Sequence, residues 1–439
     1  MDAASDTPQW RCGVENTIKR ETDAAAGLQG SESSQPAPKW TVMVFMGAGR
    51  GDGNDASLDQ YAWEDIAEMA SIFADGPVEG LDIFVELHGL DNGPAPFRRW
   101  INRNVDEQVP VRADGVQDGT ALTEFIDWSI DKADYHKYGG KKHSLLILWG
   151  HAYEFAIGHE PSRSGLDALD FGELAEVLER FQDRMQEKHQ LPASLRPRLD
   201  IIAFDACDTS TIEIANLLEP FADFLIASQI GIPLPGWPYK LILERLKASQ
   251  EAQPMSPAQF GAFAVRKFCE NYAGLVNGQP IAVSLTLLDL RLAPEVFVAA
   301  EQLAAYLAAA GGSDAGELAT IRQQFVQSQT FDDKPFVDAA ELCLNLTRFS
   351  GDEDVRLVAS ALGDLLVHPY TNGAGTRNPF IVEHGRNSHE TAKLQGVGLY
   401  APQLVSESED WRASRFWYNK FSSRETVWSR VVHLFAEEP

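Results

Sequence analysis

Cysteine is scarce in this chain, with four residues among 439. Cys12, Cys207, Cys269 and Cys343 are far apart and form no CxxC pair. This spacing argues against a zinc ribbon and against a disulfide-rich scaffold. We therefore predict that no metal ion is held by these cysteines.

Basic residues are also under-represented. The chain has 37 Lys and Arg against 64 Asp and Glu, which gives a formal net charge of -27. Nucleic-acid binding depends on neutralising phosphates with Lys and Arg. We therefore predict that nucleic acid is not a partner and that the protein is repelled by anionic surfaces.

Long apolar runs are absent from the sequence. None approaches the roughly 20 residues that a membrane helix needs, so we predict no membrane association. The first six residues, Met1-Asp2-Ala3-Ala4-Ser5-Asp6, show neither a basic start nor an apolar stretch. The sequence thus predicts a cytoplasmic protein, with a secreted protein that has lost its signal as the alternative.

Short apolar runs alternate with amphipathic segments over the first 230 residues. The runs predict strands at 40–46, 81–87, 97–101, 144–149, 199–204 and 224–228. Helical spacing of apolar residues predicts helices at 57–73, 120–135, 171–189 and 210–218. This alternation is typical of an α/β protein with a mostly parallel sheet.

The remaining sequence is more helical. Helical periodicity predicts helices at 257–274, 293–310, 315–328, 335–348 and 354–367, with strands at 281–290 and 396–400. We predict a flexible leader at 1–38, a catalytic core at 39–250 and a mostly helical region at 251–439 that completes the fold. The polar segment 249–256 is the predicted boundary between the last two.

Two predicted strands end next to residues with reactive side chains. One strand runs into Gly150-His151-Ala152, and another into Asp205-Ala206-Cys207. If the strands are neighbours, an imidazole and a thiol meet at one edge of the sheet. The backbone N–H of Ala152 or Cys207 is then a candidate oxyanion donor. An inert buried Cys and a structural His are the alternative interpretation.

A wider set of motifs resembles the clostripain family of cysteine peptidases, distant relatives of gingipains and caspases. The motifs are the strand 40–46 followed by Leu58-Asp59-Gln60-Tyr61, the strand ending at His151, Phe204-Asp205-Ala206-Cys207, and Gly236-Trp237-Pro238-Tyr239. The resemblance covers about residues 40–435. It implies a caspase-like three-layer α/β/α sandwich, with Cys207 as the nucleophile and His151 as the acid and base.

The resemblance also places the substrate pocket around Asp205, Gln229, Pro235 and Trp237. Asp205 matches an acidic residue near the P1 pocket; a loop carboxylate that caps backbone N–H groups is the alternative. Pro235 stands where the family has an acid that binds a basic P1 side chain. Because a buried guanidinium needs a charged partner, the sequence predicts a mixed or more apolar P1 preference.

Family members are often activated by cleavage between the catalytic His and Cys. The polar loop 158–165 lies in that interval, and its basic residue, Arg163, is the predicted activation site. The cut comes from the protein itself or from an activating protease. We predict no cofactor; calcium at the acidic loop 52–55 is the weaker alternative, because that loop lacks EF-hand spacing.

We therefore predict a regulated cysteine endopeptidase that acts on proteins or peptides, in a bacterial stress or defence cascade. One alternative is an inactive caspase-like binding module, which the altered P1 loop suggests. Another is an α/β thiol hydrolase that acts on a small amide.

Overall fold

A nine-stranded sheet forms the centre of the computed structural model of this chain. The structure describes residues 39–401 apart from 49–57, 89–95, 103–104, 112–118, 134–141, 154–155, 159–167, 252–253, 277–278, 329, 332–333, 373–374, 378 and 388–390. The predicted leader, 1–38, lies outside the described residues.

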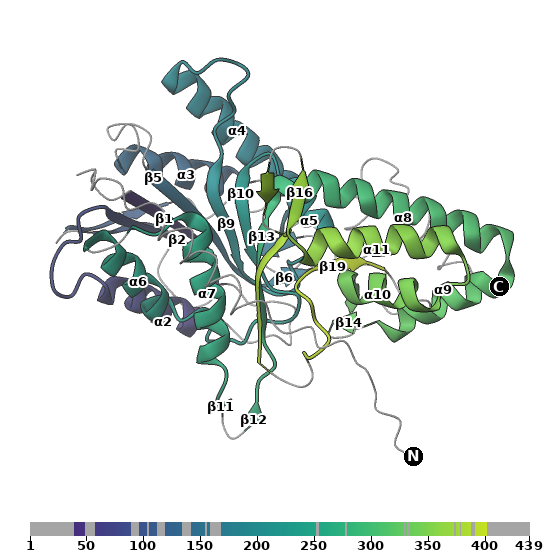
Figure 1. The fold of residues 1–439 in the computed structure, drawn as a ribbon. Helices are drawn as coiled ribbons and strands as arrows, with labels where there is room; N and C mark the ends of the chain where they lie inside the picture. The colour runs from purple at the N-terminus through teal and green to yellow at the C-terminus, as the bar shows by residue number, and fades with distance from the viewer. Residues whose placement is uncertain are drawn as a thin grey trace, which may run out of the picture. The chain divides into compact units, whose positions relative to one another are not determined.

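The strands of this sheet follow the order β18-β13-β10-β9-β5-β1-β2-β3-β4 (Figure 1). Their bounds are β1 (Lys39–Gly47), β2 (Leu81–His88), β3 (Phe97–Asn102), β4 (Val105–Pro110), β5 (Lys142–Gly150), β9 (Leu199–Asp205), β10 (Ala222–Ala227), β13 (Ser284–Asp289) and β18 (Ile381–Arg386). The five central strands, β10 to β2, are mutually parallel, and the strands beyond them pair antiparallel. This confirms the predicted α/β sheet with a parallel centre.

Helices cover both faces of the sheet. Helices α2 (Asp59–Ser71), α6 (Tyr239–Glu251) and α7 (Pro257–Asn271) share one core with Val42 and Val44 of β1. Helices α3 (Thr120–Lys132), α4 (Phe171–His189), α5 (Ile212–Leu218) and α8 (Ala293–Ser313) share the other with Met43 and Phe45. The central strands are continuously apolar because both their faces are buried. The predicted three-layer sandwich is confirmed.

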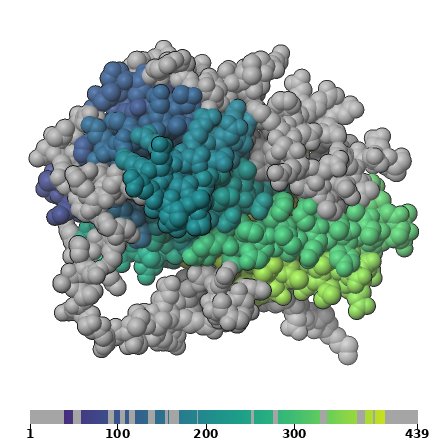
Figure 2. Space-filling view, turned by 90° about the horizontal axis from the view of Figure 1, so that it is seen from above, coloured from purple at the N-terminus to yellow at the C-terminus, as the bar shows by residue number. Residues whose placement is uncertain are grey.

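The helical C-terminal region packs onto the second core. It contains the 3-10 turn η1 (Leu290–Leu292), α8, α9 (Ala315–Gln327), α10 (Ala339–Phe349) and α11 (Glu353–Val367). Helix α11 contacts both α8 and α10. Figure 2 shows α8 in green and α11 in yellow-green along the same flank. Residues Leu290–Ser313 are long and apolar enough to cross a membrane by length and composition, although no such run was predicted, and 39% of their most apolar stretch is buried inside the protein. The predicted lack of membrane association stays a prediction.

Several boundaries differ from the predictions. The predicted helix at 335–348 begins later, because residues Lys334–Asp338 form strand β15. The side chain of Asp338 accepts a hydrogen bond from Glu341 N and so caps α10. The predicted strand at 396–400 is β19 (Gly398–Tyr400), which pairs with β15 outside the main sheet. Helix α6 and strand β18 were not predicted.

Short strands complete the described structure. They are β6 (Ala152–Tyr153) with β7 (Ala156–Gly158) and β8 (Ala168–Asp170), β11 (Leu275–Val276) with β12 (Gln279–Pro280), β14 (Thr330–Phe331) with β15 and β19, and β16 (Tyr370–Asn372) with β17 (Gly375–Arg377). Strands β13 and β18 follow the predicted boundary at 249–256, yet they belong to the same sheet as β1. The division of the chain into 39–250 and 251–439 stays a prediction.

Candidate active site

The predicted thiol and imidazole follow two neighbouring strands. Strands β5 and β9 are parallel partners, and their register pairs Trp149 with Asp205. His151 comes two residues after Trp149, and Cys207 two residues after Asp205. The carboxyl ends of parallel neighbours meet at one edge of a sheet. The structure therefore brings His151 and Cys207 to the same edge.

Gly150 makes the approach to His151 sterically feasible. Its φ of 146° is a backbone conformation that residues other than glycine rarely adopt. A Cβ atom at this position would lie 2.7 Å from the carbonyl oxygen of Gly47 on the adjacent strand β1. Strand β5 can therefore run against β1 up to its last residue and still turn into His151.

Cys207 is a partly exposed cysteine. The backbone N–H of Ile232 donates a hydrogen bond to its Sγ atom over 3.2 Å. A donor directed at sulfur favours the thiolate over the thiol. His151 and Ala152 are also partly exposed. Ala152 belongs to β6, which pairs with β7.

The turn that carries Cys207 is fixed by the end of β10. The N–H groups of Thr209 and Ser210 donate to the carbonyl oxygen of Ser228, over 2.9 and 2.8 Å. Asp208 within this turn has a φ of 56° and is buried. Sequence reasoning did not identify Ser228, because its contribution is made by a backbone atom.

A second anchor of this turn comes from the C-terminal part of the chain. Ser210 Oγ donates to the carbonyl oxygen of Gly396 over 2.7 Å, and Gly398 N donates to the carbonyl oxygen of Ser210 over 2.7 Å. Tyr400 N donates to Glu213 Oε1 over 2.8 Å. The segment after Cys207 is thus bonded to residues almost 190 positions later in the chain.

Asp205 lies beneath the loop that contains Trp237. Its carboxyl group is 4% exposed, and Oδ2 accepts hydrogen bonds from Trp237 N over 3.1 Å and from the Tyr239 hydroxyl over 3.0 Å. Tyr272 supports the same loop by donating to the carbonyl oxygen of Gly236 over 2.8 Å. Asp205 therefore holds the Gly236–Tyr239 turn through its hydrogen bonds with Trp237 N and the Tyr239 hydroxyl.

The other predicted pocket residues occupy different environments. Gln229 is buried; its Nε2 donates to Asp338 Oδ2 over 3.0 Å, and its Oε1 accepts from Gly396 N over 2.7 Å. Trp237 is buried, whereas Pro235 is exposed at the tip of its loop. Their role in a substrate pocket stays a prediction.

Asp65 is a residue near the site that sequence reasoning missed. It lies on α2, is 3% exposed, and accepts a hydrogen bond from Trp149 Nε1 over 2.8 Å. Its position in the sequence could have identified it, because it shares the buried face of an amphipathic helix with Ala62, Ile66 and Met69. An acid on an apolar helix face needs a buried partner.

Burial raises the pKa of several carboxyl groups around the site. Burial and the nearby charge of Asp205 raise the pKa of Asp65 to about 9. Burial raises the pKa of Asp205 to about 7, although its hydrogen bonds oppose this shift. Burial likewise raises the pKa of Glu213 to about 7 and that of Asp338 to about 6. Desolvation disfavours the charged carboxylate, so these groups retain protons that exposed acids lose.

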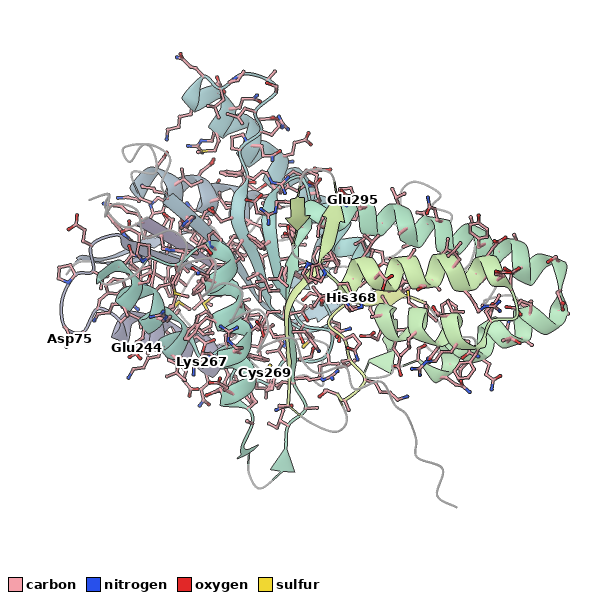
Figure 3. The ribbon with its side chains drawn as sticks, viewed as in Figure 1. Asp75, Glu244, Lys267, Cys269, Glu295 and His368 are labelled. Atoms are coloured by element: carbon pink, nitrogen blue, oxygen red, sulfur yellow. The ribbon has the colours of Figure 1, made fainter. Side chains whose placement is uncertain are left out.

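The remaining described cysteines lie in apolar surroundings. Cys269, labelled on α7 in Figure 3, is 8% exposed, and burial raises its thiol pKa to about 12. Cys343 is 2% exposed, and burial raises its pKa further. A thiol held in its neutral form is a poor nucleophile. Cys207 is thus the partly exposed cysteine of the described region.

Three predicted features fall outside the described residues: Arg163, Cys12 and the acidic loop 52–55. In the part of the chain that the structure describes, no three His, Cys, Asp or Glu side chains are grouped so as to hold a metal ion.

Solved structures with similar folds are cysteine proteases. A secreted C11 cysteine protease from Bacteroides thetaiotaomicron, in complex with an irreversible peptide inhibitor, has a TM-score of 0.54 and 17% identity, over 88% of this chain and 100% of that one. An inactive zymogen C11 protease from Parabacteroides distasonis has a TM-score of 0.52 and 18% identity, over 92% and 100%. No curated protein sequence matches the chain.

The sandwich and its parallel centre define a protein of the caspase-like α/β/α fold class. The sequence matches peptidase family C11, the Clostripain family, over residues 51–433. The chain belongs to the clostripain family. It is a cysteine-type endopeptidase, and its substrates are proteins or peptides. The predicted cytoplasmic location stays a prediction.

The buried carboxyl groups predict that folding stability falls as pH rises. Glu213 has a pKa of about 7 in the folded protein, against an ordinary value of 4.5. Between these pH values the folded chain holds a proton that the unfolded chain has released, so raising the pH favours unfolding. We expect Glu213→Gln to remove up to about 1.4 kcal/mol per pH unit of this dependence.

Urea unfolding at several pH values between 5 and 7 measures how steeply the free energy of unfolding changes with pH. Glu244→Gln is the matched control, because Glu244 is exposed on α6 (Figure 3). An equal slope for the wild type and Glu213→Gln would contradict the prediction.

Proposed function

We propose that the protein hydrolyses peptide bonds through a thioester on Cys207, with His151 as the acid and base. The parallel β5–β9 ladder carries this proposal, because it directs both residues to one edge of the sheet. The Ile232 N–H directed at Sγ supports a nucleophilic role for the sulfur. The burial of Cys269 and Cys343 supports Cys207 over these alternatives.

The proposed reaction has two stages. His151 accepts the thiol proton while Sγ attacks the scissile carbonyl carbon, and the backbone N–H of Ala152 or Cys207 stabilises the oxyanion. The tetrahedral intermediate collapses, the C–N bond breaks, and the imidazolium protonates the leaving amine. His151 then removes a proton from water, which attacks the thioester and releases the new carboxylate and the thiol.

Alkylation and cleavage together test this assignment. We expect iodoacetamide to label Cys207 at least about ten-fold faster than Cys269 or Cys343 at neutral pH, because a paired thiol is partly ionised. Cys207→Ala and His151→Ala should each abolish cleavage of a peptide library, and Cys269→Ala should retain it. Equal labelling of the three cysteines with no cleavage would support an inactive binding module instead.

We further propose that the P1 residue of the substrate is uncharged. A buried basic side chain requires a carboxylate partner. The Asp205 carboxyl group is buried and already accepts from Trp237 N and Tyr239. Pro235 supplies no charge, and Leu234 beside it is 42% exposed. These surroundings support an apolar P1 side chain rather than Arg or Lys.

Substituting the loop residue tests the P1 preference. In a peptide library, we expect the wild type to cleave after apolar residues in preference to Arg and Lys. Pro235→Asp should raise the kcat/KM for a basic P1 by about ten-fold or more, because it adds a carboxylate to the loop. Pro235→Asn is the control, because it removes the proline without adding a negative charge. A wild type that cleaves mainly after Arg or Lys would contradict the proposal.

We also propose that the protease is a zymogen activated by a cut after Arg163. The polar Gly- and Pro-containing loop between His151 and Cys207 supports an accessible cleavage site. With an uncharged P1 preference, the cut after Arg163 requires an activating protease. Its part in a bacterial stress or defence cascade stays a prediction.

Treatment with trypsin tests this activation. We expect limited trypsin to cut the chain into two fragments that stay associated through non-covalent contacts. This cut should raise peptidase activity. Intact-mass measurement should place the new C-terminus at Arg163. Arg163→Gln should prevent the cut and the gain in activity, whereas Arg180→Gln, on the exposed side of α4, should not. Full activity of uncut protein would remove the zymogen proposal.

A further inference from the structure

Two buried carboxyl groups lie behind the strand ends that lead to His151 and Cys207. Asp65 accepts from the indole N–H of Trp149, the penultimate residue of β5. Asp205 is the last residue of β9 and the register partner of Trp149. Each contact is therefore made two residues before a residue of the proposed catalytic pair.

Both contacts occupy the face of the sheet that α2, α6 and α7 cover. Trp149, Trp237 and Tyr239 belong to the same core as the buried residues of α2. Asp205 fixes Trp237 and Tyr239, and Asp65 fixes Trp149. The two carboxyl groups thus hold the β5 end and the Gly236–Tyr239 turn from the same side.

The two carboxyl groups also act on each other electrostatically. The charge of Asp205 raises the pKa of Asp65, second only to burial. In the described part of the chain, the titratable groups that interact with the pair include Glu64 and Glu68 on α2, Tyr239 on α6 and Tyr272 just after α7. Two buried like charges are unfavourable, so Asp65, whose pKa is raised to about 9, keeps its proton at neutral pH.

We propose that Asp65 is a positioning residue of the peptidase, which together with Asp205 holds Trp149 and the Gly236–Tyr239 turn in place behind His151 and Cys207. This inference rests on the proposed function of that pair. When both carboxyl groups ionise at high pH, their repulsion acts directly on the Trp149 and Trp237 contacts. The site then loses its geometry before the fold is lost.

Asp65→Asn tests this role. An amide keeps an oxygen for the Trp149 N–H but carries no charge, so Asp205 can ionise without a charged neighbour. We expect kcat/KM at pH 6 to stay within about three-fold of the wild type, since the hydrogen bond survives. The alkaline limb of the kcat profile should move upward by about one pH unit, because the like charge is gone.

The rate of Cys207 alkylation by iodoacetamide against pH gives a second measurement that needs no peptide cleavage. The alkylation rate of a simple thiol rises with pH because more thiolate forms. In the wild type we expect the rate at Cys207 to rise less than this above about pH 8. Asp65→Asn should restore that rise. Trp149→Phe, which removes the donor, should lower kcat by about ten-fold and leave KM unchanged.

Glu244→Gln is the matched control for removing an exposed negative charge from the helices that cover this face. Glu244 is exposed on α6 (Figure 3). We expect it to leave both pH profiles unchanged. Identical profiles for the wild type and Asp65→Asn would overturn the positioning role. Loss of cleavage and of selective Cys207 labelling in the wild type would instead overturn the proposed function.

Discussion

The parallel ladder between β5 and β9 is the constraint on which the proposed site depends. Its register pairs Trp149 with Asp205, and the two residues after each of them lead to His151 and Cys207. A slip of one residue would reverse the face of every side chain on one strand. The buried runs of both strands prevent this slip, because each face packs into a separate core. Packing of the whole sandwich thus sets where the imidazole and the thiol lie.

Carboxyl groups rather than cations organise the loops around this edge. Asp205 holds the Trp237 turn, Asp338 holds Gln229, and Glu213 holds Tyr400 N. Each acid is buried, and each has a raised pKa. A protonated carboxyl group both donates and accepts without requiring a counter-ion. In a chain with a net charge of -27 at pH 7, each of these acids adds nothing to the repulsion at pH values below its raised pKa.

Much of the sandwich could be predicted because its central strands are apolar on both faces, and because β1, β5 and β9 end at Gly or Asp. The same runs placed His151 and Cys207 at strand ends. Local patterns did not identify Asp65, whose partner Trp149 is 84 residues away. Gln229 was assigned to the pocket by resemblance, and its bond to Asp338 spans 109 residues. Strand β18 was missed because most of its residues are only half-buried at the sheet margin, which weakens the apolar signal.

The hydrogen bonds of Ser210, in the turn after Cys207, with Gly396 and Gly398 have a consequence for biosynthesis. On the ribosome, Cys207 is made long before these glycines, since Ser210 and Gly396 are 186 residues apart. At the roughly 5–20 residues per second of translation, the turn waits about ten seconds or more for its last anchor. In a chain still being synthesised, the turn that carries the proposed nucleophile is therefore incompletely anchored. The order of the sequence delays completion of the proposed active site until most of the protein has been made.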